Sequence, residues 1–124
     1  MLNVQNINVY YGNIQAIRDI SFRVEDGEIV TLIGANGAGK STILKSVSGL
    51  LRSKTGDITF DGKSIKSTAP HKIVAQGLAH VPEGRRVFLQ MSVEENLEMG
   101  AFTAPRNTIE DSIANVYERF PRLK

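Results

Sequence analysis

The sequence predicts an α/β fold in which a phosphate-binding loop joins a buried strand to a helix, with an antiparallel β segment ahead of the loop. The first observation is that residues 34–42 match the pattern G-x-x-x-x-G-K-S/T without a mismatch. The second is the apolar, β-branched run of 28–33 before the loop, with apolar residues at helical spacing after it. The third is the alternation of apolar and polar residues over 20–24, which ends at the hairpin signal Asp26-Gly27.

The chain ahead of the loop is expected to be rich in strands. The pattern first indicates a strand over 2–11, with a break in phase near Gln5-Asn6, and a turn at Gly12-Asn13. It then indicates a short strand or connector over 14–17, a half-buried strand over 20–24, and the hairpin that leads into the strand of 28–33. Many small nucleotide kinases instead place this loop after their first strand, so the arrangement favours a different class.

The chain after the loop alternates between helices and short strands. We first expect a helix from about Lys40 that ends at Gly49, a strand over 56–60, and a hairpin at Asp61-Gly62 with a return over 63–65. A helix from Pro70 through Ala75 should follow, then a strand over 78–81 halted by Pro82 and a polar, basic loop over 83–90. The chain should end with a helix that has a Ser92/Glu95 capping box and runs to about Met99, and a last helix capped by Thr108, with Ile109, Ile113 and Val116 on one face.

The glycines of the loop allow its backbone to wrap around a phosphate chain. Gly34, Gly37 and Gly39 have no Cβ, so successive N–H groups can point inward and form an anion-binding nest. The helix that follows adds unpaired N–H donors and the positive end of its dipole. The predicted nucleotide-binding residues are Gly34, Ala35, Asn36, Gly37, Ala38, Gly39, Lys40, Ser41 and Thr42.

Three side chains at the end of the loop have distinct expected roles. Lys40 would reach the β- and γ-phosphates, and the Ser41 hydroxyl would ligate Mg²⁺. Thr42 could donate a hydrogen bond to an α-phosphate. The alternative is a glycine-rich loop that only caps a helix.

Composition limits the other classes of function. The chain of 124 residues is 41% hydrophobic and 23% charged, as expected for one modest globular domain. It has no cysteine, which excludes disulfides and thiolate chemistry. A net charge of +2 is too weak to indicate nucleic-acid binding. Because neither a signal peptide nor a membrane-spanning run is seen, a cytosolic location is expected and any membrane role would need a partner.

Residues outside the loop carry weaker signals. Tyr11 could stack on an adenine, or it could be an ordinary half-buried strand residue. Glu83 follows a predicted strand and could hold Mg²⁺ or position a water molecule, or it could be a solvated loop acid. Arg85 and Arg86 could contact phosphate or an acidic partner, or be solvated charges. His71 and His80 are interpreted as structural.

These residues together resemble a known family. Tyr11-Gly12, residues 20–28, the loop of 34–42, Gly49-Leu50-Leu51, residues 55–58 and Asp61-Gly62 resemble the N-terminal half of an ATP-binding-cassette (ABC) ATPase. Residues 77–88, 92–97 and 120–124 are similar to the ATPase subunit of branched-chain amino-acid importers, of the second cassette type. The resemblance covers nearly the whole chain.

The resemblance implies a fold and roles for single residues. It implies a P-loop NTPase core with an N-terminal antiparallel β subdomain, divided into 1–33 (β segment and Walker A strand), 34–90 (P-loop, helix and Q-loop region) and 91–124 (start of a helical subdomain). Tyr11 corresponds to the adenine-stacking aromatic residue. Glu83 stands where most of the superfamily has the Q-loop glutamine. Arg85, Arg86 and Phe88 become candidates for docking a coupling helix of a membrane subunit.

The resemblance also implies an activity, cofactors and partners. The chain is expected to be the ATP-binding part of an importer ATPase that uses ATP and Mg²⁺. Its partners would be a second ATPase subunit, membrane permease subunits and, indirectly, a periplasmic binding protein, but not nucleic acid. Its place would be cytoplasmic, on the inner face of the plasma membrane.

The 124 residues contain no signature motif, no Walker B strand and no switch histidine. No catalytic set is therefore complete, and we expect the chain to be the N-terminal part of the subunit, truncated before those motifs. It should bind ATP without hydrolysing it efficiently, and self-associate through an exposed strand edge. Three alternatives stay open: a non-catalytic nucleotide-binding or interaction fragment, a small P-loop kinase, and a soluble cassette protein of repair or translation.

Overall fold

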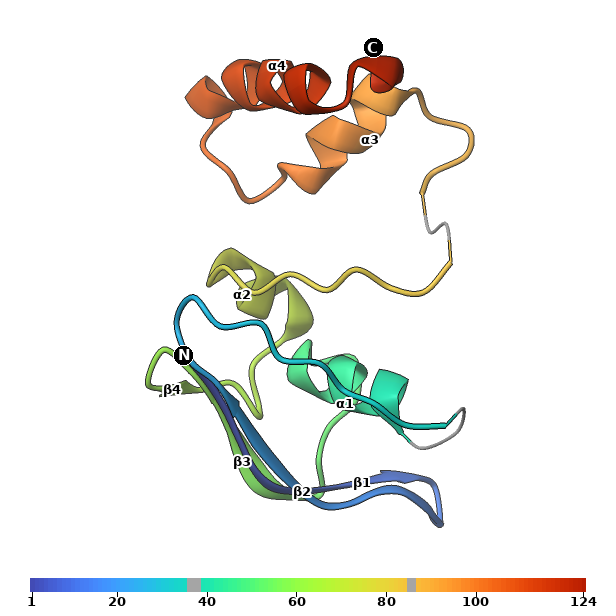
Figure 1. Cartoon of the computed structure of the whole chain (residues 1–124), viewed down its shortest axis with the longest axis vertical. Coiled ribbons are helices and arrows are strands. Elements are labelled where there is room, and N and C mark those ends of the chain that lie inside the picture. The colour runs from blue at the N-terminus through green and yellow to red at the C-terminus, as the bar shows by residue number, and fades with distance from the viewer. Residues whose placement is uncertain (36–38, 85–86) are drawn as a thin grey trace. The chain divides into compact units, whose positions relative to one another are not determined.

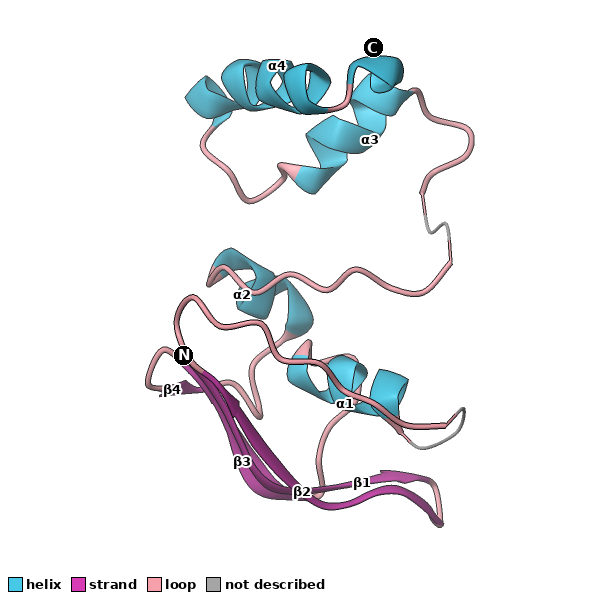
Figure 2. Cartoon of the chain, in the orientation of Figure 1, coloured by secondary structure: helices cyan, strands magenta, loops and turns pink. Residues whose placement is uncertain are grey.

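The computed structural model describes residues 1–35, 39–84 and 87–124 (Figure 1). The described chain divides into two compact units, Met1–His80 and Val81–Lys124. The first unit contains all the strands that the structure describes and two helices, whereas the second is helical (Figure 2). Each unit is described by itself below.

The first unit is built on an antiparallel sheet. Its strands are β1 (Leu2–Tyr11), β2 (Ile14–Val24), β3 (Thr55–Phe60) and β4 (Lys63–Ser64), in the spatial order β2-β1-β3-β4. β1 and β2 form a hairpin in which Leu2 pairs with Val24 and Tyr11 pairs with Ile14. The predicted β segment ahead of the loop is thereby confirmed, and the short strand or connector expected over 14–17 is continuous with the strand expected over 20–24.

The predicted break in phase near Gln5-Asn6 is a real distortion of the sheet. The register of β1 shifts between Val4 and Ile7, and Asn6 has a φ of 50°. On β3, Gly56 has a φ of 86°, and a Cβ there would overlap the carbonyl oxygens of Gln5 and Asn6. Only glycine therefore lets β3 approach β1 at the bulge.

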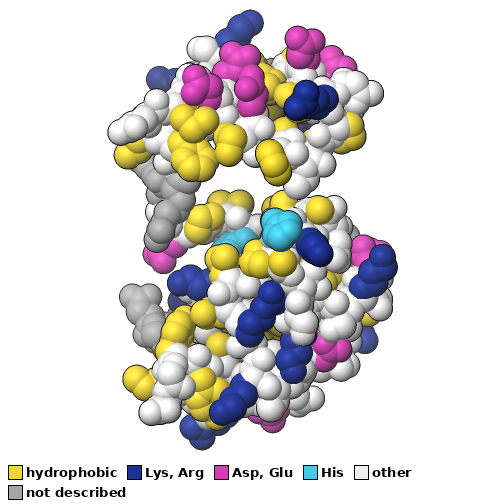
Figure 3. Space-filling view, turned by 180° about the vertical axis from the view of Figure 1, so that it is seen from behind, with side chains coloured by type: hydrophobic (Ala, Val, Ile, Leu, Met, Phe, Trp, Pro, Cys, Tyr) yellow, Lys and Arg dark blue, Asp and Glu magenta, His cyan; other side chains and the backbone are white. Residues whose placement is uncertain are grey.

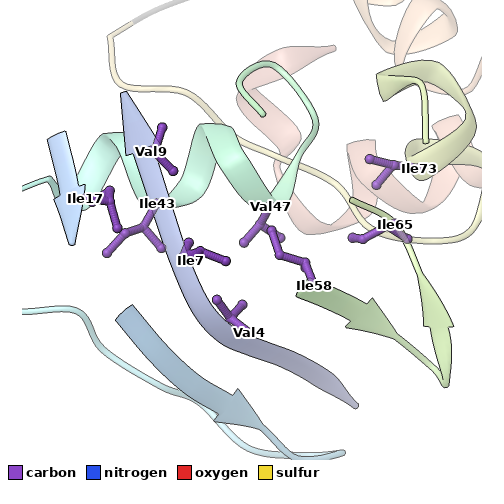
Figure 4. Packing of buried hydrophobic residues seen from close by; sticks show 9 residues of the cluster. All are labelled: Val4, Ile7, Val9, Ile17, Ile43, Val47, Ile58, Ile65 and Ile73. Carbon is purple, nitrogen blue, oxygen red and sulfur yellow. The ribbon is translucent and has the colours of Figure 1, made fainter. Parts of the chain in front are cut away.

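Two helices pack against this sheet. They are α1 (Lys40–Val47) and α2 (Pro70–Ala75). α1 is followed by Gly49 with a φ of 85°, so the predicted glycine stop is confirmed, and α2 is followed by Gly77 with a φ of 104°. The helices and strands bury one apolar cluster (Figure 4): Val4, Ile7, Val9, Ile17, Ile43, Val47, Ile58, Ile65 and Ile73.

Two predicted strands are wrong. Residues 28–33 and 78–81 are not strands, and Ile29, Ile33 and Val81 are 93%, 92% and 88% exposed. A strand needs a neighbour for its N–H and C=O groups, and within the described chain neither segment pairs with one of the four strands. The Asp26-Gly27 turn does form, with the Glu28 N–H donating to the Glu25 carbonyl over 3.1 Å, but it leads into no hairpin.

The second unit contains α3 (Val93–Gly100) and α4 (Ile109–Arg119), with 3₁₀ turns at Arg106–Thr108 and Pro121–Leu123. The Ser92 hydroxyl accepts the Glu95 N–H over 3.1 Å, as the predicted cap requires. Thr108 is the N-cap residue of α4, as predicted, but its hydroxyl donates to the Pro105 carbonyl over 2.7 Å and caps no helix N–H. None of this unit's described residues is fully buried.

The helices of the described ranges are all too short or too polar to cross a membrane.

Candidate nucleotide-binding site

The N-terminus of α1 is the centre of the site. Its N-cap is Gly39, with a φ of 97°, and no side chain caps the helix. A Cβ on Gly39 would lie 2.5 Å from Ile17 Cδ1, so the end of the loop packs closely on β2. The first turn of α1 has no acidic residue. The dipole and the N–H groups that no side chain caps make this helix end attractive to an anion.

Lys40 connects the two ends of the loop. Its Nζ donates to the Gly34 carbonyl over 2.5 Å, across six residues of sequence. An ammonium group has three donors, so this bond leaves capacity for an anionic ligand. The side chain therefore links the first residue of α1 to Gly34.

Burial of one face of α1 sets the direction of the next two side chains. Thr42, Ile43, Ser46 and Val47 are buried, and the Ser46 hydroxyl donates to the Thr42 carbonyl over 2.8 Å. Ser41 lies outside this buried face and is exposed. The helix is thus rotated so that the Ser41 hydroxyl is open to a ligand while Thr42 faces the protein.

Tyr11, the last residue of β1, reaches the same helix. Its hydroxyl oxygen lies 3.2 Å from Thr42 Oγ1, and its side chain is about half exposed. The sequence predicted Tyr11 as a separate aromatic residue and missed this contact. No local signal could have found it, because the two residues are 31 positions apart.

The structure brings together part of the predicted site. Two contacts pair predicted residues, Tyr11 with Thr42 and Lys40 with Gly34, and Gly39 is the N-cap of the helix that carries Lys40 and Thr42. Ala35 and Ser41 are exposed. Glu83 and Phe88 belong to the second unit. Five predicted residues lie outside the described residues: Asn36, Gly37, Ala38, Arg85 and Arg86.

The donor set fits a magnesium ion that is shared with phosphates. The described residues contain no group of three His, Cys, Asp or Glu side chains that could hold a metal by themselves. Mg²⁺ at nucleotide sites usually keeps water molecules and phosphate oxygens as most of its ligands. One exposed hydroxyl at Ser41, beside an anion-attracting helix end, is compatible with that arrangement.

His80, interpreted as structural, has a specific partner. Its Nδ1 lies 3.2 Å from the hydroxyl of Ser48, the C-cap residue of α1. The Ser48 hydroxyl also lies 3.3 Å from the Lys45 carbonyl and can donate to it. The contact fastens the C-terminal end of α1 to the segment that follows α2, which supports the structural interpretation.

Asn96 is a residue that the sequence analysis did not single out. Its Oδ1 accepts the Phe88 N–H over 2.9 Å, and its Nδ2 lies 3.1 Å from the Phe88 carbonyl and 2.8 Å from the Ser92 carbonyl. One side chain therefore holds the loop of 88–92 on α3. Phe88, a predicted docking residue, is 55% exposed on this loop.

Charge differs between the units. Residues 1–80 contain nine Lys or Arg and six Asp or Glu, whereas 81–124 contain six and seven. In the face drawn in Figure 3, basic side chains are spread over the first unit and acidic side chains gather on the second. The modest positive charge of the first unit suits a polyphosphate without being strong enough to indicate nucleic acid.

Comparison with known proteins agrees with this site. The sequence profile described as ABC transporter matches residues 17–123. Over all 124 residues the chain is 46% identical to BraG of Pseudomonas aeruginosa, a high-affinity branched-chain amino acid transport ATP-binding protein. Over the same residues it is 33% identical to LivF of Archaeoglobus fulgidus, a probable branched-chain amino acid transport ATP-binding protein. It covers 53% and 52% of those proteins, about half of their length.

Solved structures show the same fold. The structure of an ATP-binding subunit of an ABC transporter superposes with a TM-score of 0.85 at 30% identity, over 99% of this chain and 51% of that one. A nucleotide-free ATP-binding cassette superposes with a TM-score of 0.82 at 25% identity, over 95% and 53%. With a profile match over most of its length, a cassette fold and a phosphate loop at the start of α1, the chain belongs to the ABC transporter family.

Proposed function

We propose that the chain is the ATP-binding part of an ABC importer ATPase that couples ATP hydrolysis to the uptake of branched-chain amino acids. The observation that carries ATP binding is the arrangement of Gly34, Gly39, Lys40 and Thr42 around the open N-terminus of α1. The substrate class is supported by BraG and LivF, branched-chain amino acid transport ATP-binding proteins that each match the chain over its full 124 residues.

In the proposed complex, the helix end and Lys40 offset the negative charge of the β- and γ-phosphates. Lys40 can exchange the Gly34 carbonyl for phosphate oxygens, because that carbonyl is a neutral acceptor and phosphate is a charged one. The half-exposed ring of Tyr11 stacks on the adenine. Ser41 contributes a hydroxyl to Mg²⁺, which supplies charge neutralisation when it is bound.

Hydrolysis and transport are proposed for a larger assembly. The partners are a second ATPase subunit and membrane permease subunits, which would hold the protein at the cytoplasmic face of the membrane, with a periplasmic binding protein acting through the permease. Phosphoryl transfer depends on groups positioned around the γ-phosphate. The 124 residues include neither a signature motif nor a Walker B strand, so we propose that this chain alone binds ATP and turns it over slowly.

Glu83 is proposed as a second contributor to the metal site. Arg85, Arg86 and Phe88 are proposed as residues that dock a membrane subunit.

Calorimetry with MgATP tests the proposal. Lys40→Ala should weaken binding by about 10- to 100-fold, because a charge-assisted hydrogen bond contributes on the order of 1.5–3 kcal/mol. Lys45→Ala is the matched control, since Lys45 is an exposed lysine in the last turn of the same helix. Equal affinity of the Lys40→Ala and unmutated chains would contradict a phosphate site at α1.

Steady-state ATP turnover tests the second part. We expect the 124-residue chain to hydrolyse ATP far more slowly than intact cassette ATPases. A rate comparable to theirs would show that the chain contains a complete catalytic set. Co-purification of the subunit with permease subunits, compared with that of a Phe88→Ala variant, tests the docking proposal.

A further inference from the structure

The contact between Tyr11 and Thr42 joins a residue assigned to the base of a nucleotide with a residue assigned to its phosphates. Tyr11 ends β1, and Thr42 lies in the first turn of α1. Their hydroxyl oxygens are 3.2 Å apart, and either can be the donor. Stacking on a base needs only the ring of Tyr11, so the hydroxyl group is available for a second purpose.

Both residues are held by the structure around them. Thr42 is only 8% exposed, and its backbone carbonyl accepts the Ser46 hydroxyl. A β-branched side chain in a helix also has few rotamers. Tyr11 is paired with Ile14 across the β1–β2 turn. Burial thus fixes the Thr42 side chain, and strand pairing fixes the backbone of Tyr11.

The proton count of the pair decides what Thr42 can do. Each hydroxyl has one proton to donate and can accept other hydrogen bonds. If Thr42 donates to Tyr11, its only proton is used inside the protein. If Tyr11 donates to Thr42, the Thr42 proton is free for an external acceptor. A phosphate oxygen beside the helix end accepts but does not donate, so it selects the second arrangement.

We propose that the Tyr11 hydroxyl is a positioning group for the phosphate chain: it donates to Thr42 Oγ1 and thereby directs the Thr42 proton to a phosphate oxygen. This inference rests on the proposed nucleotide site and deepens it. Tyr11 then has two separable functions, with its ring contacting the base and its hydroxyl acting through Thr42. The ligand class is a polyphosphate, with or without an attached nucleoside.

A ligand without a base separates the two functions. Inorganic tripolyphosphate offers phosphate oxygens but no adenine ring, so stacking cannot contribute to its binding. The proposal expects Tyr11→Phe to lower the affinity for both MgATP and magnesium tripolyphosphate by about two- to tenfold, the range of one hydrogen bond, because the Thr42 hydroxyl loses the donor that fixes the direction of its proton. If Tyr11 acts only through its ring, Tyr11→Phe leaves both affinities unchanged.

The experiment is calorimetry of the 124-residue chain with both ligands, using Tyr11→Phe, Thr42→Val and the double variant. In the Thr42→Val background, Tyr11→Phe should have no further effect, because the acceptor is gone. Tyr10→Phe is the matched control: Tyr10 is the neighbouring tyrosine, and its ring contacts Lys54 Nζ at 4.9 Å. Thr42→Ser keeps the hydroxyl, so its affinity should still fall when Tyr11→Phe is added. This pair of variants tests the proposal even if Thr42→Val does not fold.

Two results would overturn the proposal: unchanged affinity of Tyr11→Phe for tripolyphosphate, or an equal loss in the chains with and without the Thr42 hydroxyl. A different result would contradict the proposed function itself. If Lys40→Ala binds MgATP as well as the unmutated chain, the site itself is wrong and the positioning role is excluded with it. If Lys40→Ala is weakened and Tyr11→Phe is not, only the positioning role is excluded.

Discussion

The two units are stabilised in different ways. The first unit, Met1–His80, has nine buried apolar residues, and all but Ile65 come from strands and helices that lie far apart in sequence. Among the described residues of the second unit, Val81–Lys124, none is buried, and side chains such as Ser92 and Asn96 pair with backbone groups close by in sequence. The difference shows that the phosphate loop is attached to the part of the chain with a cooperative core. The described part of the second unit has only half-buried apolar residues, such as Leu97, Ile113 and Val116, beside these local hydrogen bonds.

The largest expected effect tests the sheet that supports the site. Gly56→Ala should destabilise the first unit by about 2–4 kcal/mol, because its Cβ would overlap two backbone carbonyls and its φ is 86°. Gly62→Ala is the control, since its φ is 81° but no atom lies within 4 Å of the added Cβ. Its cost should be about 1 kcal/mol, from the backbone conformation alone. Urea denaturation measures both, and equal losses would contradict the close approach at the bulge.

A core truncation should cost a similar amount. Ile58→Ala removes a side chain that is 1% exposed, and we expect a loss of about 2–4 kcal/mol in the free energy of unfolding. Ile14→Ala, at a residue that is 73% exposed on β2, should change stability by less than about 0.5 kcal/mol. If the two substitutions had equal effects, the buried cluster would not be what holds the unit together.

A smaller, local effect is expected in the second unit. Asn96→Ala removes the acceptor of the Phe88 N–H and the donor to the Ser92 carbonyl. Amide hydrogen exchange at Phe88 should accelerate by about tenfold, the equivalent of one hydrogen bond, with no change at β1. Asn107→Ala, at an exposed asparagine of the 3₁₀ turn, provides the control. Unchanged exchange at Phe88 would show that the loop is held by something other than Asn96.

The smallest expected effect depends on pH. The Met1 ammonium lies 2.8 Å from Asp26 and 2.7 Å from Asp61, and these hydrogen bonds raise its pKa from 8.0 to about 10. A raised pKa stabilises the folded state below pH 8 and loses that contribution as the pH rises through about 10. The pKa of Asp26 is lowered from 3.8 by the same contact, so its contribution is present above that pH and lost as the pH falls.

The thermal midpoint should therefore be nearly flat between about pH 4 and pH 8 as far as this contact is concerned, and decline slightly above that range. All three groups are exposed, so the decline should be small and should weaken with salt. Asp61→Asn removes one carboxylate and should reduce the alkaline decline. If the thermal midpoint of this variant declined with pH as in the unmutated chain, the Met1 contact would be excluded as the cause of the decline.

The difference between the units also explains where the sequence predictions succeeded. Elements fixed by neighbouring residues were predicted well: α1 with its glycine stop at Gly49, the Ser92 cap, and the alternating strand within β2. The segments of 28–33 and 78–81 were predicted as strands from apolar runs beside a local signal, the Asp26-Gly27 turn for the first and Pro82 for the second. A strand exists only with a partner, which composition does not reveal, and Ile29 and Ile33 are exposed instead. Self-association through 28–33 and the three-part division at residues 33 and 90 stay predictions.

The sequence by itself determined the phosphate loop, the helix that follows it and the family, because glycine spacing and a Lys-Ser pair carry their chemistry over adjacent positions. Only the tertiary structure decided that Lys40 bonds to Gly34, that Thr42 faces inward and that the Tyr11 hydroxyl meets it at 3.2 Å. These facts depend on how β1 and α1 pack over a shared core. That packing joins residues far apart in sequence, and no local pattern specifies it.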